Sequence, residues 1–310
     1  MDKLTIGIPK ALLYYKYKDL WINFFENLGL NVIISPNTNK EILENGEKYC
    51  LDEACLSLKI YMGHIDYLKD KCDYILVPRI STLKKNEKVC TNFMCLYDLV
   101  SNTFEKNIIH YNIDVERKED EEYAFITMGL NLGYTYRETK NAFKLAKEYE
   151  IIMDNKRISR QINKLTNTKK RKILLAGHPY NLYDNLIGGY ITSYLESENI
   201  EILYSDNFNN KYYDKVNEEI SPRNYYTYNK EVIGSIFTHK NQVDGIILIT
   251  VFPCGPDSLT NEIILRSIDV PIINLLIDEQ LSDNGIITRL ESFLDILEER
   301  SKENEKSKSY

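Results

Sequence analysis

The chain has 310 residues, of which 39 are Lys or Arg and 46 are Asp or Glu, so its formal net charge is −7. This balance excludes a basic nucleic-acid-binding face, which needs clustered positive charge. No apolar run reaches the roughly 18–20 residues that span a bilayer, and the first residues lack the apolar segment and cleavage site of a signal peptide. We therefore expect a cytoplasmic protein whose partners include neither nucleic acid nor membrane and whose six cysteines stay reduced.

Hydrophobic periodicity divides the first half of the chain into alternating strands and helices. In chain order it predicts a strand at 4–9, a helix at 11–28, a strand at 31–35, a helix at 59–68 and a strand at 73–78. Thr38 and Glu41 have the spacing of a capping box, which predicts that another helix begins after Thr38.

The middle of the chain is richer in charge, and the second half repeats the alternation. Residues 118–122 are charged, and residues 137–165 predict a long helix or a helix pair. The pattern then predicts a strand at 173–177, a helix at 184–197, a strand at 200–205, a helix at 228–239, strands at 245–250 and 271–277, and a helix at 286–299. The polar tail at 301–310 has the composition of a disordered segment.

Near-continuous apolar strands separated by helices are typical of parallel sheets that are covered on both faces. The sequence therefore predicts an α/β protein with two doubly wound, Rossmann- or flavodoxin-like parallel-sheet domains and a helical connector. The expected divisions are an N-terminal domain at 1–117, the connector at 118–170, a C-terminal domain at 171–300 and the tail. Ligands of such folds bind beyond the carboxyl ends of the strands, so we expect the functional residues in the loops there.

The cysteines are the most informative polar residues. Cys50 and Cys55 form a C-x4-C pair, as do Cys90 and Cys95, which is a weaker metal signal than a C-x2-C pair. Cys55 precedes an amphipathic run, where the N-terminus of a helix would stabilise a thiolate. Each cysteine also fits a packing role, because a free thiol packs as a small hydrophobe. Spacing alone does not choose among zinc, an iron–sulfur cluster and no metal.

Seven segments, in order along the chain, carry a family resemblance. They are GIPKALLYYKYKDLWINFFENLG, SPNTNKEIL, DEACLSLKIYMGH, DYILVPRI, GHPYNLYD, CGPDSL, and IDEQ with GIITRLESF. With them the chain resembles the 2-hydroxyacyl-CoA dehydratase superfamily, and most closely the branch named for its link to CoA enzyme activases. The resemblance extends from about residue 4 to residue 297 and so covers nearly the whole sequence.

The resemblance implies an iron–sulfur cluster held by three cysteines from the two α/β domains. Carried over to the matching motifs, these ligands are Cys55 in DEAC, Cys90 after the VPR strand and Cys254 in CGPDS. The superfamily contains both 4Fe–4S clusters and a larger double-cubane form, and the resemblance does not choose between them.

Three further cysteines depart from the family pattern. The family typically has other residues where this chain has Cys50, Cys72 and Cys95. Cys95, five residues after Cys90, is an alternative ligand, whereas Cys72 begins a strand and fits a packing role best.

Three residues in the loops at strand ends are candidate catalytic residues. His178, in GHPYNLYD, could donate a hydrogen bond to a substrate or to cluster sulfur, or could belong to a polar turn. Arg79 could face an anion such as a CoA phosphate, or could be a surface arginine. Glu279 ends a strand and could instead cap a helix. His64, in a helical pattern, is expected to be structural.

The chain lacks both the P-loop motif and the G-x-G-x-x-G fingerprint, so we expect no intrinsic ATP site. The resemblance implies an oxygen-sensitive dimeric protein of anaerobic metabolism that accepts low-potential electrons from a separate ATP-hydrolysing activase. It would pass them to a bound substrate, such as an acyl-CoA, or to a partner. One alternative is a dehydratase subunit, which pairs with a homologous subunit and eliminates water through a ketyl radical. Another is a non-catalytic scaffold or cluster carrier.

Overall fold

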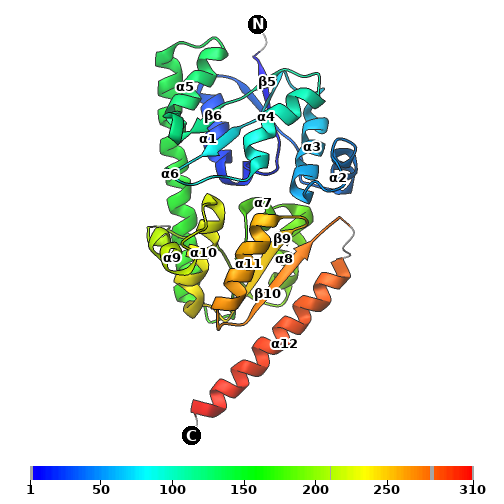
Figure 1. Cartoon of the computed structure of the whole chain (residues 1–310), viewed down its shortest axis with the longest axis vertical. Helices are drawn as coiled ribbons and strands as arrows, with labels where there is room; N and C mark the ends of the chain where they lie inside the picture. Colours follow the sequence, from blue (N-terminus) through cyan, green and yellow to red (C-terminus); the bar gives the residue numbers. More distant parts are fainter. Residues whose placement is uncertain (1–2, 210, 280–282, 309–310) are drawn as a thin grey trace. The chain divides into compact units, whose positions relative to one another are not determined.

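The computed structural model describes residues 3–209, 211–279 and 283–308. It divides into two compact units, which are described separately below (Figure 1). Unit 1 comprises Met1–Arg157 and Tyr225–Tyr228, and unit 2 comprises Ile158–Asn224 and Asn229–Tyr310. The division after Arg157 falls inside the segment that the sequence predicts to be a connector. Both units are α/β with a parallel sheet, which confirms the predicted fold class.

Unit 1 is built on a four-stranded parallel sheet in the order β2-β1-β3-β5. Its elements are β1 (Thr5–Ile8), α1 (Tyr14–Asn27), β2 (Asn31–Ile34), α2 (Lys40–Glu47), α3 (Leu56–Leu68), β3 (Tyr74–Leu76), β4 (Arg79–Thr82), α4 (Thr91–Thr103), β5 (Ile108–Ile109), β6 (Asn112–Asp114), the 3-10 turn η1 (Val115–Arg117), α5 (Glu121–Asn131) and the first part of α6 (Tyr136–Asn167).

Besides helices α4 and α5, two pairings between segments of unit 1 were not predicted from the sequence. Strands β4 and β6 form a small parallel sheet of their own. In addition, a short segment from the second half of the chain pairs with Lys88: the Lys88 amide donates to the Tyr225 carbonyl at 2.8 Å, and the Thr227 amide donates back to the Lys88 carbonyl at 3.0 Å. Both features join segments distant in sequence, so local periodicity carries no signal for them.

Unit 2 is built on a second four-stranded parallel sheet, in the order β10-β9-β7-β8. Its elements are β7 (Lys172–Ala176), α7 (Pro179–Leu182), the π-helical turn η2 (Asn185–Gly189), α8 (Tyr190–Ser197), β8 (Glu201–Tyr204), α9 (Tyr213–Ile220), α10 (Thr227–His239), the 3-10 turn η3 (Lys240–Gln242), β9 (Gly245–Val251), α11 (Gly255–Ser267), β10 (Ile272–Ile277) and α12 (Asp283–Lys308).

The two sheets share one topology. In each, the first strand lies between the second and the third, and the fourth strand follows the third. The strand order therefore reverses beside the first strand, between β1 and β3 in unit 1 and between β7 and β9 in unit 2. Ligands of doubly wound folds bind at the carboxyl ends of the strands at this reversal point. The loops after β1, β3, β7 and β9 are the ones that the topology selects.

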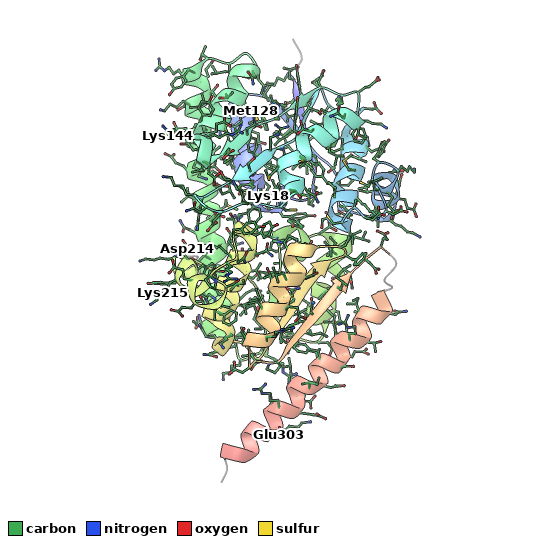
Figure 2. The ribbon with its side chains drawn as sticks, viewed as in Figure 1. Lys18, Met128, Lys144, Asp214, Lys215 and Glu303 are labelled. Atoms are coloured by element: carbon green, nitrogen blue, oxygen red, sulfur yellow. The ribbon has the colours of Figure 1, made fainter. Side chains whose placement is uncertain are left out.

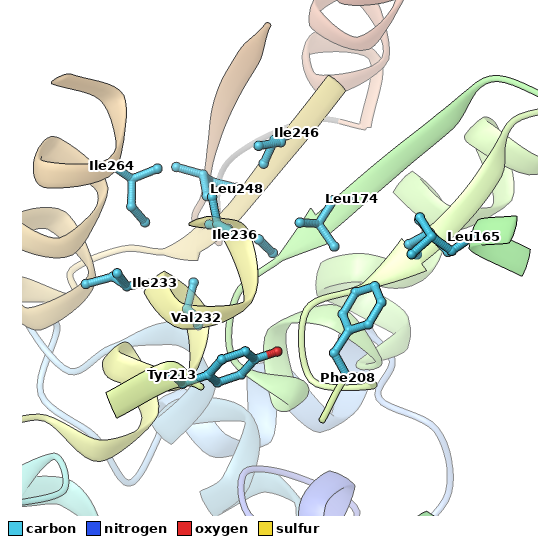
Figure 3. Packing of buried hydrophobic residues seen from close by; sticks show 12 residues of the cluster. Leu165, Leu174, Phe208, Tyr213, Val232, Ile233, Ile236, Ile246, Leu248 and Ile264 are labelled. Carbon is cyan, nitrogen blue, oxygen red and sulfur yellow. The ribbon is translucent and has the colours of Figure 1, made fainter. Parts of the chain in front are cut away.

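The core of unit 2 explains why its central strand is uniformly apolar. All seven residues of β9 are buried, because helices cover both faces of a parallel sheet. Figure 3 shows Leu174 of β7 and Ile246 and Leu248 of β9 packed with residues of α10 and α11. The cluster comprises Leu165, Leu174, Ala176, Leu203, Phe208, Tyr213, Val232, Ile233, Ile236, Ile246, Leu248 and Ile264.

Helix α6 is a single helix of 32 residues rather than a helix pair. Its outer face is charged. The side chain of Lys144, labelled in Figure 2, is 72% exposed, and its Nζ lies 3.9 Å from Glu148 Oε1. None of the helices that the structure describes is both long and apolar enough to cross a membrane.

The predicted capping box is wrong. The N-cap of α2 is Asn39, whose side chain accepts a hydrogen bond from the Ile42 amide at 2.9 Å. Thr38, which we expected to cap this helix, is fully buried and hydrogen-bonds His64 instead. Asn is as good an N-cap as Ser or Thr, so the sequence offered two adjacent candidates.

Helix α12 continues to Lys308, through most of the tail whose composition suggested disorder. An i,i+4 ion pair between Lys302 and Glu298, 2.6 Å apart, contributes to helix formation there. Gln280, in the IDEQ segment, and the last two residues of the tail lie outside the described residues.

Candidate functional site

Cys55 and Cys90 occupy the same structural position in unit 1. Cys55 is the N-cap of α3 and Cys90 is the N-cap of α4, and both helices have 13 residues. Neither thiol makes a side-chain capping hydrogen bond. The first amide groups of a helix and its dipole favour negative charge at the N-cap, so both positions favour a thiolate.

Asn92 links the two cysteines in space. It lies in the first turn of α4, two residues after Cys90, and its Nδ2 donates to Cys55 Sγ at 3.5 Å. The start of α4 therefore lies against the thiol that begins α3. Two of the three expected ligands come together in unit 1, although 35 positions separate them in the sequence.

A buried lysine adds positive charge to this region. Lys59, one turn after Cys55 in α3, is 3% exposed, and its Nζ donates to the Asp52 carbonyl at 3.0 Å. Its charge also acts on Cys50, but burial dominates there and raises the pKa of the Cys50 thiol to about 11. Cys50 is therefore a neutral thiol at pH 7, whereas Lys59 favours negative charge nearby.

The other two cysteines of unit 1 differ from the N-cap pair. The Cys72 thiol donates to the Leu68 carbonyl at 3.3 Å and packs against Gly7, where an added Cβ would lie 2.6 Å from Cys72 Sγ. Burial raises the pKa of this thiol, as expected for a packing role. Cys95 is exposed on α4.

In unit 2 the third expected ligand, Cys254, is also an N-cap. It follows β9 and begins α11, again a helix of 13 residues, with Gly255 and Pro256 in the first turn. The Ser258 hydroxyl donates to the Cys254 carbonyl at 2.7 Å, which fixes this turn. An added Cβ at Gly255 would meet no described atom within 4 Å, so the approach to the start of α11 is open.

Asp257 connects Cys254 with His178. Its Oδ1 lies 2.8 Å from His178 Nε2 and accepts from Asn229 Nδ2 at 2.9 Å, and Asn229 also donates to the Thr260 hydroxyl at 3.0 Å. Burial alone would raise the pKa of Asp257, but His178, then Asn229 and the Cys254 thiol, hold it below its usual value. The carboxylate is therefore charged at pH 7, and the side chains of His178, Asn229 and Cys254 are its hydrogen-bond partners.

This network lies at the reversal point of the unit 2 sheet. His178 follows β7, and Cys254 follows β9, the neighbouring strand. The structure thus brings together two residues that the sequence singled out separately. Sequence reasoning missed Asp257 and Asn229. The signal for Asp257 was available, because an acid three residues after an N-cap is a common helix start.

Arg79 lies at the other candidate position, after β3 in unit 1. Its guanidinium pairs with Asp98 and stacks over the Tyr97 ring, 5.2 Å from the ring centroid. The Tyr97 ring in turn lies 4.2 Å from that of His110, which follows β5. Glu279 lies in a turn after β10 and is exposed. His64 is fully buried in α3.

Within the described residues, no three His, Cys, Asp or Glu side chains form a group that could hold a metal ion. The expected ligand set takes two cysteines from unit 1 and one from unit 2, so neither unit by itself supplies it. The six cysteines, all of them described, are thiols rather than disulfides.

Comparison with solved structures gives only distant likenesses. The SBP FpvC from P. aeruginosa in complex with Ni2+ is 10% identical, with 89% of this chain and 87% of that chain covered and a TM-score of 0.28. The Zn(II)-bound ZnuA-like domain of Streptococcus pneumoniae AdcA is 11% identical, with 96% and 98% covered and a TM-score of 0.29. At these TM-scores neither likeness informs the fold or the function of this chain.

The comparison with protein families is decisive. No curated protein matches the chain. The model of the CoA enzyme activase uncharacterised domain (DUF2229) matches residues 5–208, about two thirds of the sequence, including unit 1 from Thr5 to Arg157 and the first two strands of unit 2. The chain therefore belongs to the family of the CoA enzyme activase uncharacterised domain, the branch that the sequence motifs indicated.

Proposed function

We propose that the chain is an iron–sulfur protein whose cluster is held by Cys55, Cys90 and Cys254. The observation that carries the proposal is the shared position of these cysteines: each is the N-cap of a 13-residue helix. Thiolates are the preferred ligands of iron–sulfur clusters, and helix N-termini favour thiolates. Cys50 and Cys72, which the family pattern does not use, are instead held as thiols by burial.

The surroundings of the three thiols fit a cluster. Asn92 donates a hydrogen bond to Cys55 sulfur, and hydrogen bonds to ligand sulfur tune the potential of such clusters. Lys59 supplies buried positive charge one turn from Cys55, which offsets the negative charge of thiolate ligands. In unit 2, Asp257 accepts from His178 and holds its ring. The Cys254 thiol, which donates to the same carboxylate, would lose its proton on binding iron.

A bound cluster would supply low-potential one-electron chemistry. The chain carries no P-loop, so the ATP-driven step that delivers the electron belongs to a separate activase. The chain would pass the electron on to a bound substrate, such as an acyl-CoA, or to a homologous subunit. Asp257 holds the His178 ring at the reversal point, where the substrate of a doubly wound fold binds.

Anaerobic purification followed by iron, sulfide and zinc analysis tests the cluster. We expect a brown protein that contains iron and acid-labile sulfide and loses its visible absorption in air. A colourless protein with stoichiometric zinc would contradict the proposal. Reduction by an activase with ATP then distinguishes an electron acceptor from a scaffold, because only the acceptor changes its EPR spectrum when ATP is added.

A further inference from the structure

A second polar cluster lies in unit 1, in the loops after β1 and β2. The Lys10 amide donates to the Ser35 hydroxyl at 2.7 Å, and Lys10 Nζ donates to Asn37 Oδ1 at 2.5 Å. Thr38 Oγ1 lies 3.0 Å from His64 Nε2. These loops follow the carboxyl ends of adjacent parallel strands, and β1 is the strand beside which the order reverses. This is the part of the unit 1 sheet where a ligand is expected.

The polar side chains of this cluster are buried. Ser35 is 2% exposed, and both Thr38 and His64 are 0% exposed. Buried polar groups cost free energy unless they are hydrogen-bonded, so any unsatisfied donor or acceptor among them requires an explanation. His64 lies near the other end of α3 from Cys55, so this group of polar residues is separate from the proposed iron–sulfur ligands.

His64 leaves one ring nitrogen unsatisfied. Its Nε2 contacts Thr38, whereas its Nδ1 is buried and has no hydrogen-bond partner among the described residues. Burial, followed by the charge of Lys10, lowers the pKa of His64 to about 3, so the ring is neutral at pH 7. A neutral imidazole has one donor and one acceptor nitrogen. Where the Thr38 hydroxyl donates to Nε2, the Nδ1 hydrogen is a buried donor that lacks an acceptor.

Lys10 carries a positive charge that no carboxylate neutralises. Its Nζ contacts an amide oxygen, and none of the described acidic residues forms an ion pair with it. An ammonium has three donors, so two remain after the Asn37 contact. The protein as a whole has a net charge of −7, yet the Lys10 ammonium lacks a carboxylate partner among the described residues. It is therefore available to pair with an anion.

The backbone of the loop after β1 is also unusual. Leu12 is 4% exposed and has φ +48°, a left-handed conformation that bulky residues rarely adopt. It lies between Lys10 and α1, whose N-cap residue, Leu13, makes no side-chain capping bond. A left-handed φ at a buried leucine costs free energy, so the surrounding structure holds this loop in place.

We propose that Lys10, Ser35 and His64 form a binding site for an oxyanion, a carboxylate or phosphate group of a small molecule. The Lys10 ammonium supplies the charge, and the buried Ser35 hydroxyl and His64 Nδ1 supply directed hydrogen bonds. Anion binding at this site needs no iron–sulfur cluster, so it is measured on the purified full chain whatever its metal content. A chain without iron could still bind the anion, and a chain with a cluster could fail to bind it.

Isothermal titration with inorganic phosphate, acetate and CoA tests the site. We expect wild type to bind at least one of them with a Kd of about 1 mM or tighter. Binding of phosphate and CoA but not acetate identifies a phosphate ligand, and binding of acetate alone identifies a carboxylate. Lys10→Met should weaken binding at least tenfold, whereas Lys3→Met, at the amino end of the same strand, should leave it unchanged. No binding of any probe by wild type, or equal binding by Lys10→Met, would overturn the proposal.

A second measurement tests the role of His64 without altering the site. In protein labelled with 15N-histidine, the ring resonances of His64 are assigned as those missing in His64→Gln. Saturating wild type with the bound probe should shift the Nδ1 resonance of His64 and leave that of His239, in unit 2, in place. An unchanged His64 Nδ1 resonance under saturation would show that His64 does not contact the anion.

Discussion

His178 Nε2 and Asp257 Oδ1 lie 2.8 Å apart, and this hydrogen bond joins the loop after β7 to the first turn of α11. Both side chains are buried, and the residues are 79 positions apart in the sequence. The pair holds together the two strand ends at which the order of the unit 2 sheet reverses. The same carboxylate also accepts from the Cys254 thiol, which would lose this proton when its sulfur binds iron.

Asp257→Ala should lower the free energy of unfolding of the protein by about 3 kcal/mol, because it leaves His178 and Asn229 without their buried acceptor. Asp257→Asn keeps an acceptor oxygen and should cost less. Urea denaturation measures both. The matched control is Asp269→Ala, which removes a carboxylate that is 85% exposed and forms an ion pair with Lys240, and it should leave the unfolding midpoint in place. Equal effects of Asp257→Ala and Asp269→Ala would show that the network contributes nothing to stability.

Gly63→Ala should destabilise unit 1 severely. Helices α2 and α3 cross so closely that an added Cβ at Gly63 would lie 1.9 Å from the Ile42 carbonyl oxygen, and one at Gly46 would lie 1.8 Å from the Lys59 carbonyl oxygen. The backbones must separate, and since overpacking typically costs about 1–3 kcal/mol, we expect a loss of about 3 kcal/mol where backbone atoms clash. Gly255→Ala, where the added Cβ meets no described atom, should leave stability unchanged or slightly increased. Thermal unfolding followed by circular dichroism compares the two, and a Gly63→Ala protein as stable as wild type would disprove the close crossing.

The stability of the protein should fall as the pH drops from about 6.5 toward about 3, in part because of His64. Its pKa is about 3 in the folded chain, owing to burial and to Lys10, and about 6.5 when unfolded. The unfolded state therefore binds a proton that the folded state does not, and the loss from His64 reaches about 1.4 kcal/mol at pH 5.5. Urea midpoints at pH 7.5 and pH 5.5 measure the loss. The difference between the two midpoints should be smaller in His64→Gln, and an identical difference would contradict the assigned burial of an uncharged ring.

Much of the fold was predictable because parallel sheets leave a strong local signal. Strands such as β9 are apolar along their whole length, and helices such as α1 have regular apolar spacing. The helix starts at Cys90 and Cys254 were not predicted. The signal for the first was available, because Phe93, Leu96 and Val100 have helical spacing and are buried, whereas α11 buries the polar residues Asp257, Thr260 and Asn261 and so lacks an apolar face of this kind. The pairing of Lys88 with Tyr225–Tyr228 depends on contacts between distant segments, which no local pattern encodes.

The candidate site, like the fold, was predicted only in part from the sequence. The motifs identified Cys55, Cys90 and Cys254, and each lies at a helix start. The residues that orient them, Asn92 and Asp257, were visible in the sequence but had no assigned role. Their importance follows from distances in space: 3.5 Å from Asn92 Nδ2 to Cys55 Sγ, and 2.8 Å from Asp257 Oδ1 to His178 Nε2.

The iron content of single cysteine variants tests the central claim most directly. Cys55→Ser, Cys90→Ser and Cys254→Ser, purified without oxygen, should each lose most of their iron and the cluster EPR signal. Cys72→Ser, which replaces a thiol bonded to the Leu68 carbonyl, should retain both. Cys95→Ser, at an exposed position on α4, should retain them too. Iron and EPR signals equal to wild type in all three N-cap variants would contradict the account.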